Sequence, residues 1–125
     1  MKKYDALKEP DPREWLELDE QERVGLIADY HRRKRVDLPS RMMHAVFHAA
    51  VENQLTEGMP VVRETLSRLM REGLDRHEAI HAIGSALAEC VWGTLRRDSS
   101  ADDANEVYLR ALRDLTLAGW LKKAR

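Results

Sequence analysis

The sequence predicts an all-α protein: a compact bundle of four to five helices with a short additional helix near the N-terminus. Apolar residues recur at intervals of three and four through most of the chain, which is the period of an amphipathic helix. No window of four or more residues alternates apolar and polar side chains in the β-branched pattern of a strand. We therefore expect residues 1–125 to form a single helical domain, with its structured core at about 11–118.

Capping residues and helix breakers divide the chain into helices. Asp11 before Pro12 predicts a short helix around Trp15, and Asp19 predicts the start of a second helix that runs to about Lys34. Four more helices are predicted at about 40–55, 60–73, 75–95 and 101–117, separated by stretches rich in Gly, Pro, Asp and Ser. Because the connections are short, we expect sequential helices to be antiparallel neighbours.

Composition argues against several classes of partner. Lys and Arg number 21 and Asp and Glu 22, so the formal net charge of −1 attracts neither nucleic acid nor a membrane surface. The N-terminal residues lack the apolar segment of an export signal, and no apolar stretch approaches the length of a membrane span. With Cys90 as its single cysteine the chain cannot form an internal disulfide. We expect a cytoplasmic protein with no nucleotide or organic cofactor. The composition is compatible with a homodimer.

The spacing of the histidines is the strongest indication of function in the sequence. Four of the five form two pairs with the same spacing, His44 with His48 and His77 with His81. Residues four apart lie on one face of a helix, and both pairs fall on or beside the apolar faces, so their side chains are expected to point inward. Two such pairs on facing helices can complete a four-coordinate shell. We therefore predict a metal site formed by these four residues.

Two carboxylates extend the predicted site. Glu52 continues the line of the first histidine pair and Glu89 lies beyond the second pair, so both are candidates for extra ligands or for oxygen partners of the imidazoles. Nitrogen and oxygen ligands suit a divalent ion of Zn, Fe, Ni or Mn, without a choice among them. A closed shell would favour a structural ion and an open position would permit catalysis, so enzymatic activity is not decided.

Two other interpretations compete with the metal site. Buried histidines can be satisfied by hydrogen bonds to neighbours such as Gln54 and Ser85, and the chain would then be a metal-free helical interaction or oligomerisation module. Residues 77–81 also match H-E-x-x-H, in which Glu78 would activate a zinc-bound water. Capping by Asp75 explains Glu78 equally well, so a metallohydrolase is the weakest of the three interpretations.

The remaining polar and aromatic signals are interpreted as structural. His31 begins the basic run 31–35 at the end of its helix, where cations complement the helix dipole, so we place it outside the site. Trp15, Trp92 and Trp120 are expected to be core or rim anchors. Cys90 is expected to be a small buried apolar residue rather than a nucleophile.

Two stretches of the chain combine a histidine pair with acidic, amide and aromatic residues. They are His44-x3-His48 with Glu52-Asn53-Gln54, and His77-x3-His81 with Glu89 and Trp92. Together, over about residues 43–92, they resemble a small bacterial domain-of-unknown-function family with paired H-x-x-x-H helices. The chain departs from that family at Ser85, where members have Glu, and in the position of the Glu before Gln54. The resemblance implies an all-helical cytoplasmic protein and no established activity.

Overall fold

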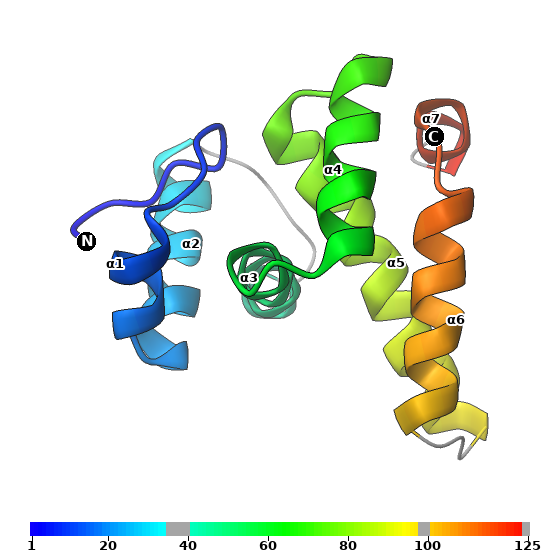
Figure 1. Ribbon diagram of the computed structural model, residues 1–125. Helices are drawn as coiled ribbons and strands as arrows, with labels where there is room; N and C mark the ends of the chain where they lie inside the picture. The colour runs from blue at the N-terminus through cyan, green and yellow to red at the C-terminus, as the bar shows by residue number, and fades with distance from the viewer. Residues whose placement is uncertain (35–40, 98–100, 124–125) are drawn as a thin grey trace.

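The computed structural model describes residues 1–34, 41–97 and 101–123, and within these ranges it is built from helices without a strand (Figure 1). The helices are α1 (Pro12–Glu17), α2 (Glu20–Arg33), α3 (Arg41–Thr56), α4 (Pro60–Glu72), α5 (Arg76–Arg97), α6 (Ala101–Asp114) and α7 (Leu117–Lys123). The prediction of an all-helical fold is thus confirmed. None of these helices is long and apolar enough to cross a membrane, as far as the described ranges go.

The helix starts follow the capping residues that the sequence provides. The Asp11 carboxylate accepts hydrogen bonds from the first backbone N–H groups of α1. Asp19 and Glu22 form a reciprocal capping box at the start of α2. Asp75 accepts from the Glu78 backbone N–H at 2.8 Å, one residue before α5 begins. Each carboxylate satisfies N–H groups that have no partner within the helix and lies at the positive end of the helix dipole.

The C-terminal helix is shorter than its periodicity predicts. The helix expected to reach residue 117 ends at Asp114, and a separate helix, α7, begins at Leu117. The Leu117 backbone N–H donates to the Glu72 carboxylate at the end of α4, at 2.9 Å, and the Thr116 hydroxyl accepts from the Gly119 N–H at 3.0 Å. The break therefore depends on a partner 45 residues away in the chain.

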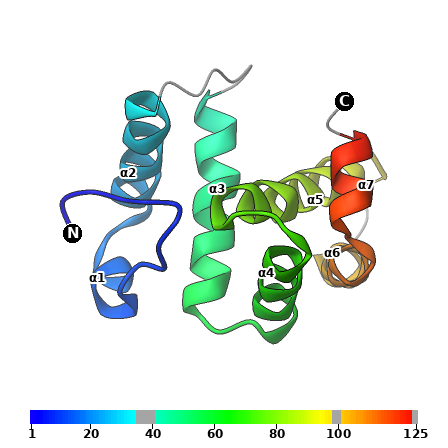
Figure 2. The same ribbon diagram turned by 90° about the horizontal axis from the view of Figure 1, so that it is seen from above.

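Helix α3 lies at the centre of the molecule, between α2 on one side and α5 on the other, while α5 also packs on α4 and α6 (Figures 1 and 2). Figure 1 shows α3 end-on while α4 and α6 run along the plane of the view. Consecutive helices α3 and α4 therefore cross, and the prediction of antiparallel sequential neighbours is wrong at this step. The N-terminal segment and α7 lie at opposite ends of the molecule (Figures 1 and 2).

Two apolar cores lie on the two sides of α3. The first joins the N-terminal segment, α1, α2 and α3 through buried residues such as Tyr4, Trp15 and Ile27. The second joins α3, α4, α5 and α6 through residues such as Leu69 and Leu112. Histidine rings from α2, α3 and α5 meet between these cores. The fold thus places a polar cluster where three helices converge.

Gly73 offers a test of the fold at the end of α4. Its φ is +122°, a conformation that strains any residue with a Cβ. We expect Gly73→Ala to lower the free energy of unfolding by about 1–2 kcal/mol. Gly25→Ala is the matched control, because a Cβ there meets open space within α2, and it is expected to raise the free energy of unfolding by about 0.5–1 kcal/mol. Urea denaturation measures both, and equal effects would contradict the positive φ.

Candidate metal centre

Three helices bring all five histidines of the chain to one point. The rings come from the last turn of α2 (His31), from α3 (His44 and His48) and from the start of α5 (His77 and His81). One nitrogen from each ring lies within 4.8 Å of every other. Within the described residues, no carboxylate or thiol belongs to this group. The potential ligand set is therefore entirely imidazole nitrogen.

The separations between Nε2 atoms match those of nitrogens that share an ion. The Nε2 atom of His31 lies 3.1 Å from those of His44 and His77 and 3.4 Å from that of His81. The Nε2 atoms of His44 and His81 are 2.8 Å apart. Two nitrogens bound at zinc-like distances are separated by about 2.8 Å at a right angle and about 3.4 Å at the tetrahedral angle. These four separations fit nitrogens that share one ion, and all five rings have a nitrogen within 4.8 Å of the others.

The backbone of α2 sets the tautomer of His31. Its Nδ1 lies 2.8 Å from the Ile27 carbonyl oxygen, which can only accept a hydrogen bond. Nδ1 therefore carries the proton, and Nε2 of the neutral ring presents its lone pair to the other imidazoles. A ring nitrogen anchored to a carbonyl while the other nitrogen is free to coordinate is the usual arrangement of a metal-binding histidine.

A buried polar chain sets the tautomer of His48. Arg76 donates two hydrogen bonds to the two Glu52 oxygens, each at 2.8 Å, and the Tyr4 hydroxyl contacts both Glu52 and, at 2.8 Å, His48 Nε2. A carboxylate paired with Arg76 only accepts, so the Tyr4 proton points to Glu52. The Tyr4 oxygen then accepts from His48 Nε2–H, which leaves the lone pair on Nδ1.

That Nδ1 atom has no hydrogen-bond partner, although the His48 side chain is only 2% exposed. Among the described residues it is the single buried side-chain nitrogen or oxygen left without a partner. Leaving such an atom unsatisfied costs about 1–3 kcal/mol. Tyr4, Glu52 and Arg76 are buried as well, so three buried side chains determine which nitrogen of His48 carries the lone pair.

Burial keeps the imidazoles neutral. Loss of solvation, with repulsion from the neighbouring histidines, lowers the pKa of His44 to about 4 and that of His81 to about 2. The pKa values of His31, His48 and His77 are lowered by the same loss of solvation. Neutral rings carry the lone pairs that a metal ion requires.

Residues 11–114 match the profile of a family described as a domain of unknown function, DUF1841. The chain belongs to this family. The matched range of the DUF1841 chain contains all five histidines, Glu52 and Arg76, while Tyr4 precedes it. Searches of curated proteins and of solved structures found no match. Family membership thus supplies no activity.

The six predicted ligands of the DUF1841 chain do not all lie together in the structure. Four of them, His44, His48, His77 and His81, lie together in the histidine cluster. Glu52 is fully buried, but its carboxylate binds Arg76 and Tyr4 and reaches the cluster only through the tyrosine. Glu89 is exposed and lines a different hollow, beside Val107 of α6. Neither carboxylate is a member of the ligand group.

His31 is the residue that sequence reasoning placed outside the site. Its ring is 4% exposed and lies among the other four, whereas its neighbours Arg32 and Arg33 are exposed at the end of α2. The signal that could have found it is its spacing of four from Ile27, which lies on the buried face of the same helix. The basic run thus contains one histidine that faces the interior, followed by two arginines that face solvent.

Glu78, the acid of the H-E-x-x-H match, has another partner. Its carboxylate is exposed and accepts a hydrogen bond from Trp120 Nε1 of α7 at 3.0 Å, while its backbone N–H is capped by Asp75. This contact assigns Glu78 to the docking of α7. The water-activating role that the motif requires has no support in its position.

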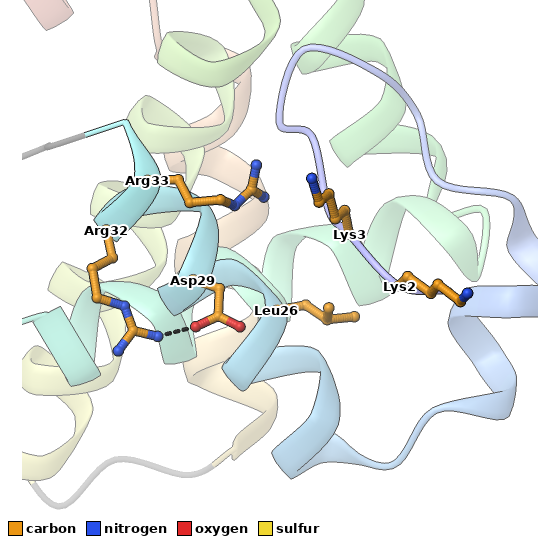
Figure 3. A pocket seen from close by; sticks show the side chains of 6 residues that line it. All are labelled: Lys2, Lys3, Leu26, Asp29, Arg32 and Arg33. Carbon is orange, nitrogen blue, oxygen red and sulfur yellow. Dashed lines mark hydrogen bonds and ion pairs between the residues drawn. The ribbon is translucent and has the colours of Figure 1, made fainter.

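A second hollow, of about 450 Å³, lies between α2 and the N-terminal segment. Figure 3 shows Arg32 paired with Asp29 and Arg33 extended toward the N-terminal segment, while Lys2 is directed away from both arginines. Arg33 donates to the Tyr4 carbonyl at 3.0 Å. Arg32 and Arg33 thus have partners within the chain, while Lys3 extends toward Arg33 (Figure 3). Arg35, the last residue of the basic run, lies outside the described residues.

The lowered pKa values predict how the metal-free protein responds to acid. Unfolded histidine titrates near pH 6.5, so below that pH the unfolded state takes up protons that folded His44 and His81 do not. We expect the free energy of unfolding to be constant above about pH 7 and to fall as the pH drops from about 6.5 toward 4. Urea denaturation after chelation measures it, with His44→Asn expected to show a shallower dependence. A flat profile between pH 7.5 and 5.5 would contradict the buried, neutral rings.

Proposed function

We propose that this DUF1841 protein binds one divalent transition-metal ion between α2, α3 and α5, with the five histidines as its ligands. The observation that carries this proposal is the unpartnered Nδ1 of His48, whose ring belongs to the cluster of five imidazoles and whose tautomer is set by Tyr4, Glu52 and Arg76. A core histidine in a metal-free module would be expected to have both ring nitrogens satisfied. A cation bound by the cluster would satisfy this lone pair.

The chemistry of the donors narrows the choice of metal. The expectation that included Mn rested on oxygen ligands from Glu52 and Glu89, and neither carboxylate lies in the ligand group. Imidazole nitrogen suits Zn, Fe and Ni, whereas Mn prefers oxygen. Structural zinc sites are almost always four-coordinate, so five nitrogens favour an ion with a larger coordination number. The proposal therefore favours Fe or Ni over Zn, and disfavours Mn.

Two single substitutions distinguish the five-histidine site from the site expected from sequence. His31→Ala removes a ligand that spacing did not reveal, and we expect the affinity for Ni²⁺ to fall by about tenfold or more. Glu89→Ala is the matched control on α5 and is expected to change the affinity by less than about twofold. Calorimetric titration of Ni²⁺ into chelated protein measures both affinities.

If instead Glu89→Ala lowers the affinity for Ni²⁺ and His31→Ala does not, the result would support the ligand set predicted from the sequence. Metal analysis of the untagged, purified protein provides a further check, together with the His48→Ala, His81→Ala double variant. If the metal content is sub-stoichiometric and the double variant leaves it unchanged, the proposed site is wrong.

The Tyr4 hydroxyl can be tested separately from the ligands. Tyr4→Phe keeps the ring but removes the acceptor for His48 Nε2–H, so the Nδ1 lone pair is no longer enforced. We expect metal affinity to fall about 10- to 100-fold. Tyr108→Phe is the control, because it deletes a comparably buried hydroxyl bonded to Gln54 at 2.6 Å, outside the histidine cluster. Equal metal affinities in the two variants would show that Tyr4 does not orient the ligand.

A further inference from the structure

A cavity of about 520 Å³ opens against the histidine cluster. His44, His48 and His81 form part of its wall, while Trp92 and Trp120 contribute aromatic surface. The volume lies within the range of small-molecule sites in proteins, about 300–1,000 Å³. Three of the five imidazoles thus lie next to a space large enough for an organic ligand.

The rest of this cavity is apolar. Phe47, Met43, Ile80 and Ala88 supply most of the remaining surface, Ser85 adds one hydroxyl, and among the described lining residues none is Lys, Arg, Asp or Glu. Such a wall suits an aromatic or aliphatic body and disfavours a phosphorylated or multiply charged molecule, whose charges would lose their hydration without a partner. A charged end of the ligand is therefore expected to face the histidines, since Ser85 offers only a neutral hydroxyl.

One aromatic wall of the cavity is held in place by α7. The Trp120 indole donates from Nε1 to the Glu78 carboxylate of α5 at 3.0 Å, next to the ligand His77. A short C-terminal helix is thus tied to the helix that carries two of the histidines. The wall is a built part of the site rather than a loosely apposed surface.

The charge of the proposed metal site indicates which polar group the ligand carries. A divalent ion held by five neutral imidazoles keeps its full charge, because the nearest buried carboxylate, Glu52, is already neutralised by Arg76 at 2.8 Å. Three other carboxylates act on His77: Asp75 and Glu78 are exposed, so solvent screens them, and Asp5 is half-buried. Five nitrogens also leave one position of a six-coordinate ion for a ligand from outside. An anionic oxygen is the donor that this charge favours.

We propose that the cavity binds a small organic monoanion, with its aromatic or aliphatic body against Trp92, Trp120 and Phe47 and its carboxylate or phenolate oxygen on the metal. This inference rests on the metal site proposed above. The metal supplies the only cation that faces the cavity among the described residues, so the anion binds the metal-loaded protein and not the metal-free chain.

Three matched probes test the proposal in Ni²⁺-loaded full-length protein. Benzoate has both the apolar body and the anionic oxygen, acetate has only the donor, and benzamide has the body without the charge. We expect calorimetry to show benzoate binding about tenfold or more tightly than either of the others, and no benzoate binding after chelation. Ala88→Leu fills the cavity and is expected to weaken benzoate binding about tenfold while Ni²⁺ stoichiometry is retained. Ala118→Leu, on the exposed side of α7, should leave it unchanged.

The outcomes separate the two proposals. If Ni²⁺ fails to bind, both the metal site and the anion site are wrong. If Ni²⁺ binds but benzoate binds no better than acetate, or equally well without the metal, only the anion site is wrong. Unchanged benzoate affinity in Ala88→Leu overturns the location, and Ser85→Leu provides a second filling variant should the first not fold.

Discussion

The buried ion pair between Arg76 and Glu52 is the interaction on which both the fold and the site depend. Glu52 is fully buried on α3 and Arg76, at the first position of α5, is 6% exposed. The same guanidinium donates to the Ala6 carbonyl at 3.0 Å, so the pair joins the N-terminal segment to two helices. Burying two charges contributes little net stability compared with an apolar contact, but removing one partner is costly. The pair therefore commits the chain to one arrangement of these three segments.

That arrangement extends directly into the histidine cluster. Tyr4 lies in the N-terminal segment that Arg76 fastens, and its hydroxyl links Glu52 to His48. Burial raises the pKa of the Tyr4 phenol well above its ordinary value, which keeps the proton that the link requires. The tautomer of a ring on α3 is thus decided by residues from two other parts of the chain. This coupling explains why a costly buried pair lies next to neutral imidazoles.

Helices α1, α2 and α7 also form hydrogen bonds with residues near the histidine cluster. The Trp15 indole on α1 donates to the Asn53 amide oxygen of α3 at 2.9 Å, and Arg23 of α2 donates to the same oxygen at 3.1 Å. These contacts fix α2, and with it His31, against the central helix. On the opposite side Trp120 binds Glu78 and extends the wall beside the cluster. The short helices α1 and α7 thus combine apolar packing, through Trp15 and Trp120, with hydrogen bonds to residues near the site.

The helices and the inward direction of two histidine pairs can be predicted from the amino-acid sequence. Both follow from local rules, since capping and a period of 3.6 residues act within one helix and can be read along the chain. What it did not reveal involves partners from elsewhere: His31 as the fifth ring, Glu52 as the partner of Arg76, and the break before α7 that Glu72 stabilises. These contacts appear only in the folded chain, because the packing of the helices on one another determines which atoms meet. Spacing within a helix shows which side chains share a face, but not what lies opposite that face.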